Sequence, residues 1–527
     1  MNLANQDVQR PLNPMDWLAN LRKIIGPLGG TWPVLLILLP ALPIVFALVA
    51  AFTPSASFNH IARLLLTDMV MTTVALVGLS AVLATCLGTS LAWLVTAYDF
   101  TGRRFLSWSL ALSLALPAYV SAYSWGDFLD IRGFWVAVLV YVTTLYPYIY
   151  LAARSAFEAQ SVCALEAARM LGASAWRRFN AIAIPMARPA IAAGAALAAL
   201  EMASDYGAAD HLGVQTLTIG IFKAWFSMSD LAAAARISLI LLIGVLILIW
   251  VERRFRSGIV AGGSTRWRTP TRVNLPPSQS ALALVFGLSV LSVALLLPIG
   301  HLFSLALEHG LPSRDFIKPM MSTALMCLLG ASVTLIIAGV SAFAAHRSVG
   351  MAKLIRTSAL AGYATPGAVT ALGILAALSF FGNGAAAVLA GPLAIIALCY
   401  AYIARFTAAG LEPISAGLEK STRSMREAAS IMGAKPFARF LRLEAPLAAP
   451  SAFAAALIVA VEIAKELPAT TILRPFGLDT LAVRAHSYAA DERLGAAAWP
   501  ALAIVALALI PTLIFSHGLS KSRAGQS

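Results

Sequence analysis

Long apolar runs alternate with short polar segments along the whole chain of 527 residues. A run of roughly 17 to 25 apolar residues is long enough to cross a bilayer as a helix. The pattern contains twelve such runs, which begin near residues 33, 70, 105, 133, 189, 234, 280, 323, 353, 384, 449 and 495. It therefore predicts an all-α polytopic membrane protein that spans the lipid bilayer twelve times.

Composition supports the same interpretation, since 60% of the residues are hydrophobic and 12% are charged. Soluble proteins carry about a quarter charged residues. The net charge of +14 alone would suggest a nucleic-acid partner. However, when the loops are assigned alternately to the two faces, most of the Lys and Arg residues fall on one face, as the positive-inside rule requires. We therefore expect no nucleic acid as partner, and we expect both termini in the cytoplasm.

A polar segment rich in Arg, Gly, Ser, Thr and Pro, at residues 253–279, divides the chain. This composition is typical of a solvated linker. It separates a first half at 33–252 from a second half at 280–516, each with six predicted helices, and leaves cytoplasmic tails at 1–32 and 517–527. Because an even number of helices precedes the linker, both halves enter the membrane from the same side, which predicts parallel repeats.

A short pattern at 158–188 in the first half recurs at 412–449 in the second, at a constant offset of 261 residues. The first copy reads Glu166, Ala167, Ala168, then Gly172 and Pro185, and the second reads Glu427, Ala428, Ala429, then Gly433 and Pro446. Both copies fall on the basic face. A chain that presents the same element twice is suited to a partner that is itself two-fold symmetric.

Each copy predicts a helix, a turn and a second helix. In the first, Gly172 is expected to end a helix in the left-handed conformation and Ser174 to cap the next one. That second helix is expected to run from Trp176 to Ile182 and to stop before Pro185, with Pro189 opening the following span. In the second copy, Pro436 is expected to open the second helix. Small Ala side chains and a basic rim make each hairpin a predicted docking surface.

The pattern Glu-Ala-Ala, a Gly six residues after the Glu, and an apolar-x-apolar-Pro end resembles the EAA loop of the membrane subunits of ABC importers. Two copies in two six-helix halves resemble the fused permeases of the ferric-iron importer family, from about residue 65 to residue 515. Further matches are Glu201 through Asp205-Tyr206-Gly207, Glu462 through Lys465-Glu466-Leu467-Pro468-Ala469, and Asp491-Glu492-Arg493-Leu494. The second copy departs from the pattern, because Arg442-Leu443-Glu444-Ala445 gives it a weaker apolar end.

This resemblance implies the type I importer fold, also called MetI-like, with two six-helix halves in a pseudo-two-fold arrangement. It implies that the two loops dock on a dimeric ABC ATPase and that a periplasmic substrate-binding protein delivers the cargo. It also implies a multi-pass protein of the bacterial inner membrane. The chain contains no Gly-x4-Gly-Lys-Ser/Thr phosphate loop, so we expect a separate subunit to bind and hydrolyse ATP, and no cofactor on this chain.

Four carboxylates lie where the chain is predicted to be inside the membrane. Glu201 and Asp205 stand one helical turn apart, and Glu462 and Glu466 hold the equivalent places in the second half. An ionised carboxylate costs several kcal/mol at membrane depth unless it is paired or faces water, so these residues are functional candidates. One hypothesis is a negatively charged vestibule for a hard cation such as ferric iron. The alternative is that they are helix-end residues that fix the geometry of a gate, with Lys465 neutralising one of them.

No metal site is certain from the sequence, because the four cysteines and the histidines are dispersed. The function that fits best is a permease subunit of an ATP-driven importer, with ferric iron as the implied cargo. Similar fused permeases serve thiamine or phosphonate compounds, which are alternatives. A secondary transporter driven by an ion gradient also uses duplicated halves and intramembrane carboxylates, but it would not need matched hairpins. An enzyme is disfavoured because no nucleophile, base and orienting group can be assembled.

Overall fold

The computed structural model describes residues 32–159, 168, 170–256, 272–312, 314–347, 349–380, 382, 391–434 and 436–521. Within these residues the regular structure is helical, except for the parallel strands β1 (Tyr98–Asp99) and β2 (Val273–Asn274). The first half contains α2 (Trp32–Ala51), α3 (Phe58–Leu64), α4 (Leu66–Ala97), α5 (Arg103–Ser109), η2 (Leu112–Ala115), α6 (Ala118–Leu129), α7 (Phe134–Ala159), α9 (Ala175–Arg178), η3 (Phe179–Ala183), α10 (Ile184–Ser204), α11 (Gly207–His211), α12 (Leu217–Phe222), η4 (Lys223–Ser227) and α13 (Leu231–Arg256).

The second half contains α14 (Pro277–Leu291), η5 (Ser292–Leu296), α15 (Leu297–His309), η6 (Arg314–Phe316), α16 (Ile317–Arg347), α17 (Val349–Ala364), α18 (Gly367–Phe380), α20 (Leu393–Leu418), α21 (Arg423–Ile431), α22 (Pro436–Arg439), η7 (Phe440–Glu444), α23 (Ala445–Lys465), α24 (Pro468–Leu473), α25 (Leu481–Ala490) and α26 (Leu494–Lys521). Ten of the described helical segments are long and apolar enough to cross a membrane, and two broken pairs bring the total to twelve. The prediction of a polytopic all-α protein is confirmed, and the predicted number of twelve spans is reached when each bent pair is counted as one span.

Both broken spans are interrupted at a proline. Leu116 adopts an extended conformation before Pro117, and η2 and α6 on either side are part of a pair bent by 92°. The residue before a proline is driven out of the helical region by the clash with the proline ring. In the second half α17 likewise ends, and α18 begins, around Pro366. The two halves thus place a broken span at corresponding points.

Three π-helical turns precede prolines by the same spacing. The turns η3, η5 and η7 end two residues before Pro185, Pro298 and Pro446, and each continues directly into an α-helix. A proline lacks the N–H that an α-helix needs and clashes with the carbonyl one turn earlier, and a wider turn relieves both problems. The prediction that a helix stops before Pro185 is therefore wrong. Pro189 does not open the span either, but lies inside α10.

The described structure divides into two compact units, and each is considered by itself. Unit 1 contains residues 1–42, 329–363 and 402–460, and unit 2 contains residues 43–328, 364–401 and 461–527. The units do not follow the predicted linker, because the start of α2 belongs with helices of the second half. In unit 1, for example, Ser358 donates a hydrogen bond to the carbonyl of Ile37.

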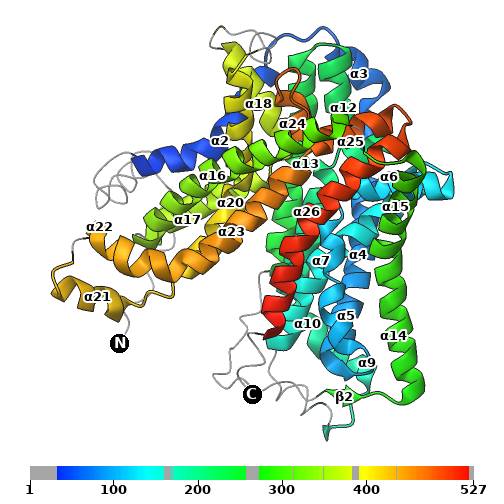
Figure 1. The fold of residues 1–527 in the computed structure, drawn as a ribbon, viewed down its shortest axis with the longest axis vertical. Coiled ribbons are helices and arrows are strands. Elements are labelled where there is room, and N and C mark those ends of the chain that lie inside the picture. Colours follow the sequence, from blue (N-terminus) through cyan, green and yellow to red (C-terminus); the bar gives the residue numbers. More distant parts are fainter. Residues whose placement is uncertain are drawn as a thin grey trace, which may run out of the picture. The chain divides into compact units, whose positions relative to one another are not determined.

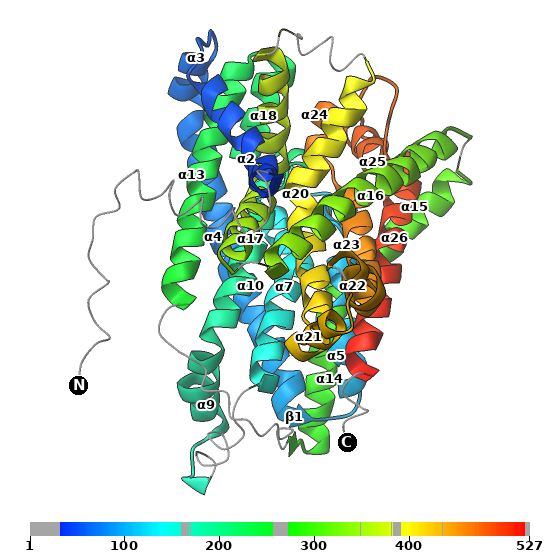
Figure 2. The same ribbon diagram turned by 90° about the vertical axis from the view of Figure 1, so that its left-hand side faces the viewer.

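The core of unit 1 is built from small and branched apolar side chains of α2, α16, α17, α20 and α23. Gly362 makes the close packing possible, since a Cβ there would lie 2.1 Å from the carbonyl oxygen of Ala404. In unit 2, α4, α7 and α10 run side by side as a bundle (Figures 1 and 2). The short helix α9 lies at one end of this unit, whereas α12, α24 and α25 lie at the other (Figure 1).

Candidate functional site

The first hairpin turns at Gly172, as predicted. This glycine has a φ of +77°, and the N–H of Ala173 donates to the carbonyl of Ala168 at 2.9 Å, which is the closing bond of a Schellman turn. The hydroxyl of Ser174 then accepts a hydrogen bond from the N–H of Arg177 and caps α9. Both expectations are confirmed. Glu166 and Ala167, which belong to the same predicted site, lie outside the described residues.

The second hairpin repeats this backbone geometry. Gly433 has a φ of +82°, and the N–H of Ala434 donates to the carbonyl of Ala429 at 3.0 Å, in the same pattern as in the first hairpin. Thr422 caps α21 by accepting from the N–H of Met425. Pro436 begins α22, as predicted. In Figure 2 the helices α21 and α22 fold back on each other as the hairpin of unit 1.

Each hairpin presents two large apolar side chains to solvent just before its glycine. Met170 and Leu171 are 89% and 87% exposed, and Ile431 and Met432 are 88% and 86% exposed. We call these four residues the apolar tips. Side chains of this size and exposure mark a surface that another molecule covers. The sequence argument emphasised the alanines and the basic rim and missed the apolar tips, although both pairs recur at the offset of 261.

The second hairpin is supported internally by a buried ion pair. The Nε of Arg439 lies 3.2 Å from Oε1 of Glu444, which is only 4% exposed. The same guanidinium donates to the hydroxyl of Ser430, which in turn donates to the carbonyl of Arg426. Glu444, which weakens the sequence pattern, is therefore the buried counter-ion of Arg439, and Arg439 in turn links α22 to α21 through Ser430.

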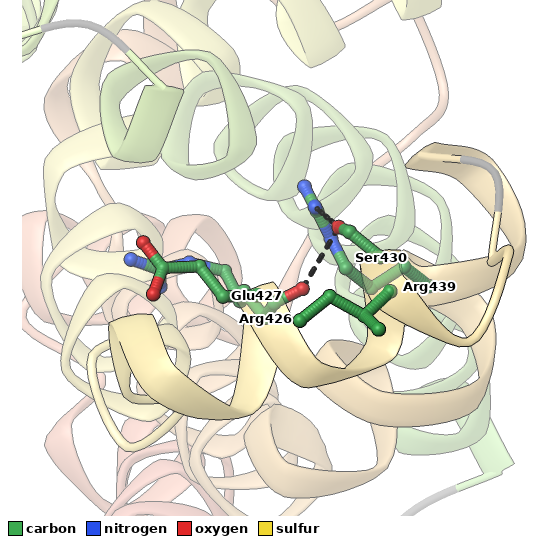
Figure 3. A pocket seen from close by; sticks show the side chains of 5 residues that line it. Arg426, Glu427, Ser430 and Arg439 are labelled. Carbon is green, nitrogen blue, oxygen red and sulfur yellow. Dashed lines mark hydrogen bonds between the residues drawn. The ribbon is translucent and has the colours of Figure 1, made fainter.

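A depression of about 530 Å³ opens beside this ion pair. Figure 3 shows Arg439 reaching across the hairpin towards Ser430, with Arg426 and Glu427 on the same helix. The residues that line this depression are Arg426, Glu427, Ser430, Ile431 and Arg439. Glu427 and Ile431 belong respectively to the predicted motif and to the apolar tip, so the motif faces the concave side of the hairpin.

The first hairpin lacks this support. Arg178 stands at the position equivalent to Arg439, but Ala183 stands where the second hairpin has Glu444. Within the residues that the structure describes, the Nε of Arg178 is buried and has no hydrogen-bond partner. The two hairpins therefore share a backbone and an apolar tip but differ in how their cationic side chains are neutralised.

Two of the four predicted acids are helix caps in unit 2. Oδ2 of Asp205 accepts from the hydroxyl of Tyr141 and from the N–H of Ala208, both at 2.9 Å, at the start of α11. Glu466 accepts from the N–H of Ala469 at 2.9 Å and from the N–H of Thr470 at 2.8 Å, at the start of α24. A carboxylate at a helix start satisfies N–H groups that have no partner in the helix. This geometry favours the alternative in which these two acids fix helix ends.

The other two acids precede these caps by one turn. Glu462 forms an ion pair with Lys465 at 2.7 Å, and both side chains are 19% exposed. Glu201 is half-buried. Among the described residues, no group of three His, Cys, Asp or Glu side chains could hold a metal ion. Whether Glu201 and Glu462 contact cargo stays a prediction.

Comparison with known proteins identifies the family. Residues 17–259 match the family model described as binding-protein-dependent transport system inner membrane component. A relative that spans nearly the whole chain is the Fe(3+)-transport system permease protein FbpB 2 of Haemophilus influenzae, 26% identical over 92% of this chain and 97% of its own length. The chain is therefore similar to this permease family in its first half, and similar to a permease named for Fe(3+) transport over nearly its whole length.

Two other relatives match part of this permease. The sulfate transport system permease protein CysT of Escherichia coli is 26% identical over 31% of the chain and 66% of its own length. The molybdenum transport system permease protein ModB of Escherichia coli is 33% identical over 23% of the chain and 60% of its own length.

The family assignment confirms the main sequence predictions. The protein is a multi-span inner-membrane permease of a binding-protein-dependent ABC transporter, with the MetI-like type I fold. The alternative of a secondary transporter driven by an ion gradient is thereby set aside. The matched residues include the first hairpin, so the EAA-type loop lies inside the region that carries the family likeness.

Proposed function

We propose that this permease imports ferric iron, which a periplasmic binding protein delivers, and that a dimeric ABC ATPase drives the import by docking on the two hairpins. The cargo assignment is supported by the relative that covers almost the whole chain, whose name specifies Fe(3+) transport. The sulfate and molybdenum permeases match less than a third of the chain. Thiamine and phosphonate compounds are the alternative cargoes.

The observation that carries the proposed docking is the duplication of one surface. Both hairpins turn through a left-handed glycine, and both expose an apolar pair directly before it. Two equal docking elements on one chain fit a partner made of two equal subunits. Docking by a cytoplasmic ATPase places the hairpins and both termini in the cytoplasm, and ATP then binds to the partner while the permease itself needs no cofactor.

The continuous helices after the hairpins provide the mechanical connection. The segment Ala175–Ser204 is one span, in which the π-helical turn η3 absorbs Pro185 without a break. The equivalent segment in the second half runs as Arg442–Lys465. In each half the chain runs from the hairpin through this helix to a carboxylate that caps the next helix, Asp205 or Glu466. Movement of the hairpins by the ATPase would therefore reach the far ends of α10 and α23 and drive alternating access.

Charge substitution at the apolar tips tests the docking. Leu171→Asp combined with Met432→Asp should abolish co-purification of the ATPase subunit and reduce uptake of radioactive ferric iron to background, because two desolvated apolar contacts would become buried charges. Leu311→Asp is the matched control, since Leu311 is 88% exposed in the loop that follows α15. Co-purification of the ATPase with the double variant at the wild-type level would exclude the hairpins as its docking site.

The cargo requires a separate experiment. We expect the partner binding protein, purified from cells, to carry ferric iron, and vesicles containing the complete transporter to import ferric iron rather than thiamine or a phosphonate. Measuring the bound metal by mass spectrometry and uptake with each labelled compound decides this. Uptake of thiamine or of a phosphonate, with no uptake of iron, would overturn the iron assignment and leave the docking proposal intact.

A further inference from the structure

Three sequence segments that resemble the permease family converge in unit 2 at the end away from α9. The first is the junction of α10 and α11, the second is the junction of α23 and α24, and the third is the turn at Asp491–Leu494. The helix α10 contains 21 residues, which corresponds to about 30 Å at 1.5 Å per residue. The convergence therefore lies roughly one membrane thickness from the first hairpin.

A chain of polar contacts joins the two halves of the sequence at this point. The hydroxyl of Tyr123 on α6 lies 3.1 Å from Nδ1 of His486 on α25, and Nε2 of the same ring lies 3.3 Å from Oδ2 of Asp210 on α11. Tyr123 and His486 are both buried. The two ring nitrogens of His486 thus face different partners, the hydroxyl of Tyr123 on one side and the carboxylate of Asp210 on the other, so one ring makes both contacts.

Further polar contacts between the halves surround this chain. Nε2 of His301 lies 2.7 Å from Oδ2 of Asp127, and Nη1 of Arg132 lies 3.4 Å from Oε1 of Glu492 at the exposed rim. Each pair joins a residue of 33–252 to a residue of 280–516. Hydrogen bonds and ion pairs at an exposed rim contribute little each. Two surfaces held together by such exposed hydrogen bonds and ion pairs come apart more readily than two apolar surfaces of the same area.

The space around the chain is filled by side chains. A Cβ at Gly207 would lie 2.6 Å from Leu467 and 2.7 Å from Tyr119, which leaves no room for a side chain at this position. The start of α11 is therefore packed directly against α6 and the start of α24. The ring of His211 packs edge-on against Tyr123. Burial and the charge of Arg132 lower the pKa of His211 to about 4. These contacts bring α6, α11 and the start of α24 against one another at this end of unit 2.

We propose that the Tyr123–His486–Asp210 chain is the latch of the gate on the side of the binding protein, and that it must part for cargo to enter. His486 is a positioning residue, because it holds the two halves together through Tyr123 and Asp210. The inference rests on the proposed alternating access. The side chain of Asp210 is 34% exposed, so the latch has one open edge at which separation can begin.

Reversible cross-linking of the rim tests whether this contact opens. Arg132→Cys and Glu492→Cys are introduced together, after replacement of the four native cysteines by Ser, into the complete transporter with its ATPase and binding protein. A short reducible bis-methanethiosulfonate reagent should abolish uptake, and a reductant should restore it. Each single-cysteine variant treated in the same way is the control. Wild-type uptake by the cross-linked double variant would overturn the proposal.

Removal of one hydroxyl tests the latch itself. Tyr123→Phe should raise ATP hydrolysis in the absence of binding protein by roughly threefold to tenfold, because loss of one hydrogen bond shifts the closed–open equilibrium by that factor. Tyr146→Phe is the matched control, because its buried hydroxyl donates at 2.7 Å to the carbonyl of Leu110 within the same half. Equal ATP hydrolysis by the two variants would overturn the latch.

Co-purification separates the two proposals. If the ATPase remains bound to the Tyr123→Phe variant but its activity is unchanged, the latch is wrong and the docking proposal stands. If the ATPase does not bind even the wild-type chain, the docking proposal itself has failed.

Discussion

The two hairpins have the same backbone turn, yet among the described residues the internal ion pair is found in the second hairpin and not in the first. Gly172 and Gly433 adopt nearly the same left-handed conformation, at φ of +77° and +82°. In the second hairpin Arg439 is neutralised by the buried Glu444, whereas the first has Arg178 and Ala183 at these positions. The comparison shows that the tip geometry and its support are separate features, and that only the tip is duplicated.

This difference has a mechanical consequence. In the second hairpin Arg439 is paired with the buried Glu444 on its own helical segment and donates a hydrogen bond to Ser430 on α21, so these contacts order the hairpin before any partner arrives. In the first hairpin the Nε of Arg178 makes no hydrogen bond with any of the described residues. We therefore expect the first hairpin to depend more on its partner for order than the second does.

The largest expected effect comes from breaking the ion pair. Arg439→Ala should destabilise the second hairpin by about 3–5 kcal/mol, because Glu444 would remain as a buried charge without its partner. Arg178→Ala should change the first hairpin by less than about 1 kcal/mol, since among the described residues no buried carboxylate is paired with it. Hydrogen–deuterium exchange of the two hairpins measures both effects.

The double variant Arg439→Ala with Glu444→Ala sharpens this comparison. In this variant the second hairpin has alanine in place of Glu444, as the first hairpin has Ala183, and no buried charge is left unpaired. The hairpin should therefore recover most of its protection against hydrogen–deuterium exchange. If the double variant exchanged as fast as Arg439→Ala alone, the buried charge would not be the cause of the loss.

Substitution of either hairpin glycine should destabilise its hairpin to the same, intermediate extent. Gly172→Ala and Gly433→Ala should each cost the respective hairpin about 1–2 kcal/mol, because a side chain in the left-handed region is strained although nothing lies within 4 Å. Gly244→Ala is the control, since Gly244 lies inside α13 with open space around it and alanine favours a helix. Thermal unfolding monitored by proteolysis at each hairpin compares them, and unequal losses would show that the two turns are not equivalent.

The smallest effect is expected at the caps. Ser174→Ala and Thr422→Ala each remove one side-chain acceptor at the start of a helix, which costs about 1 kcal/mol. The substitution should loosen α9 in the first hairpin and α21 in the second, and the same exchange experiment resolves which peptides lose protection. Ser174→Asp keeps a side-chain acceptor at this position. If α9 keeps its exchange protection in this variant, the loss in Ser174→Ala is due to the missing cap and not to lost packing.

Local sequence was sufficient for the features that depend on neighbouring residues. The apolar runs became ten spanning helices and two bent pairs, Gly172 ended a helix, and Ser174 capped the next, because hydrophobic length, backbone freedom and a short hydroxyl act within a few residues. The prediction failed at Pro185, where a π-helical turn accommodates the proline and keeps the helix continuous. That choice depends on the packing of the whole span and not on the proline alone.

The sequence by itself therefore determined the membrane class, the number of spans, the duplicated hairpins and the family likeness, since each is written in residues close along the chain. Only the tertiary structure decided what the acids do. Asp205 is a cap because Tyr141 and the start of α11 come to it, and Asp210 meets Tyr123 and His486 from segments far away in the sequence. Such contacts are fixed by how helices pack, and residue spacing carries no information about them.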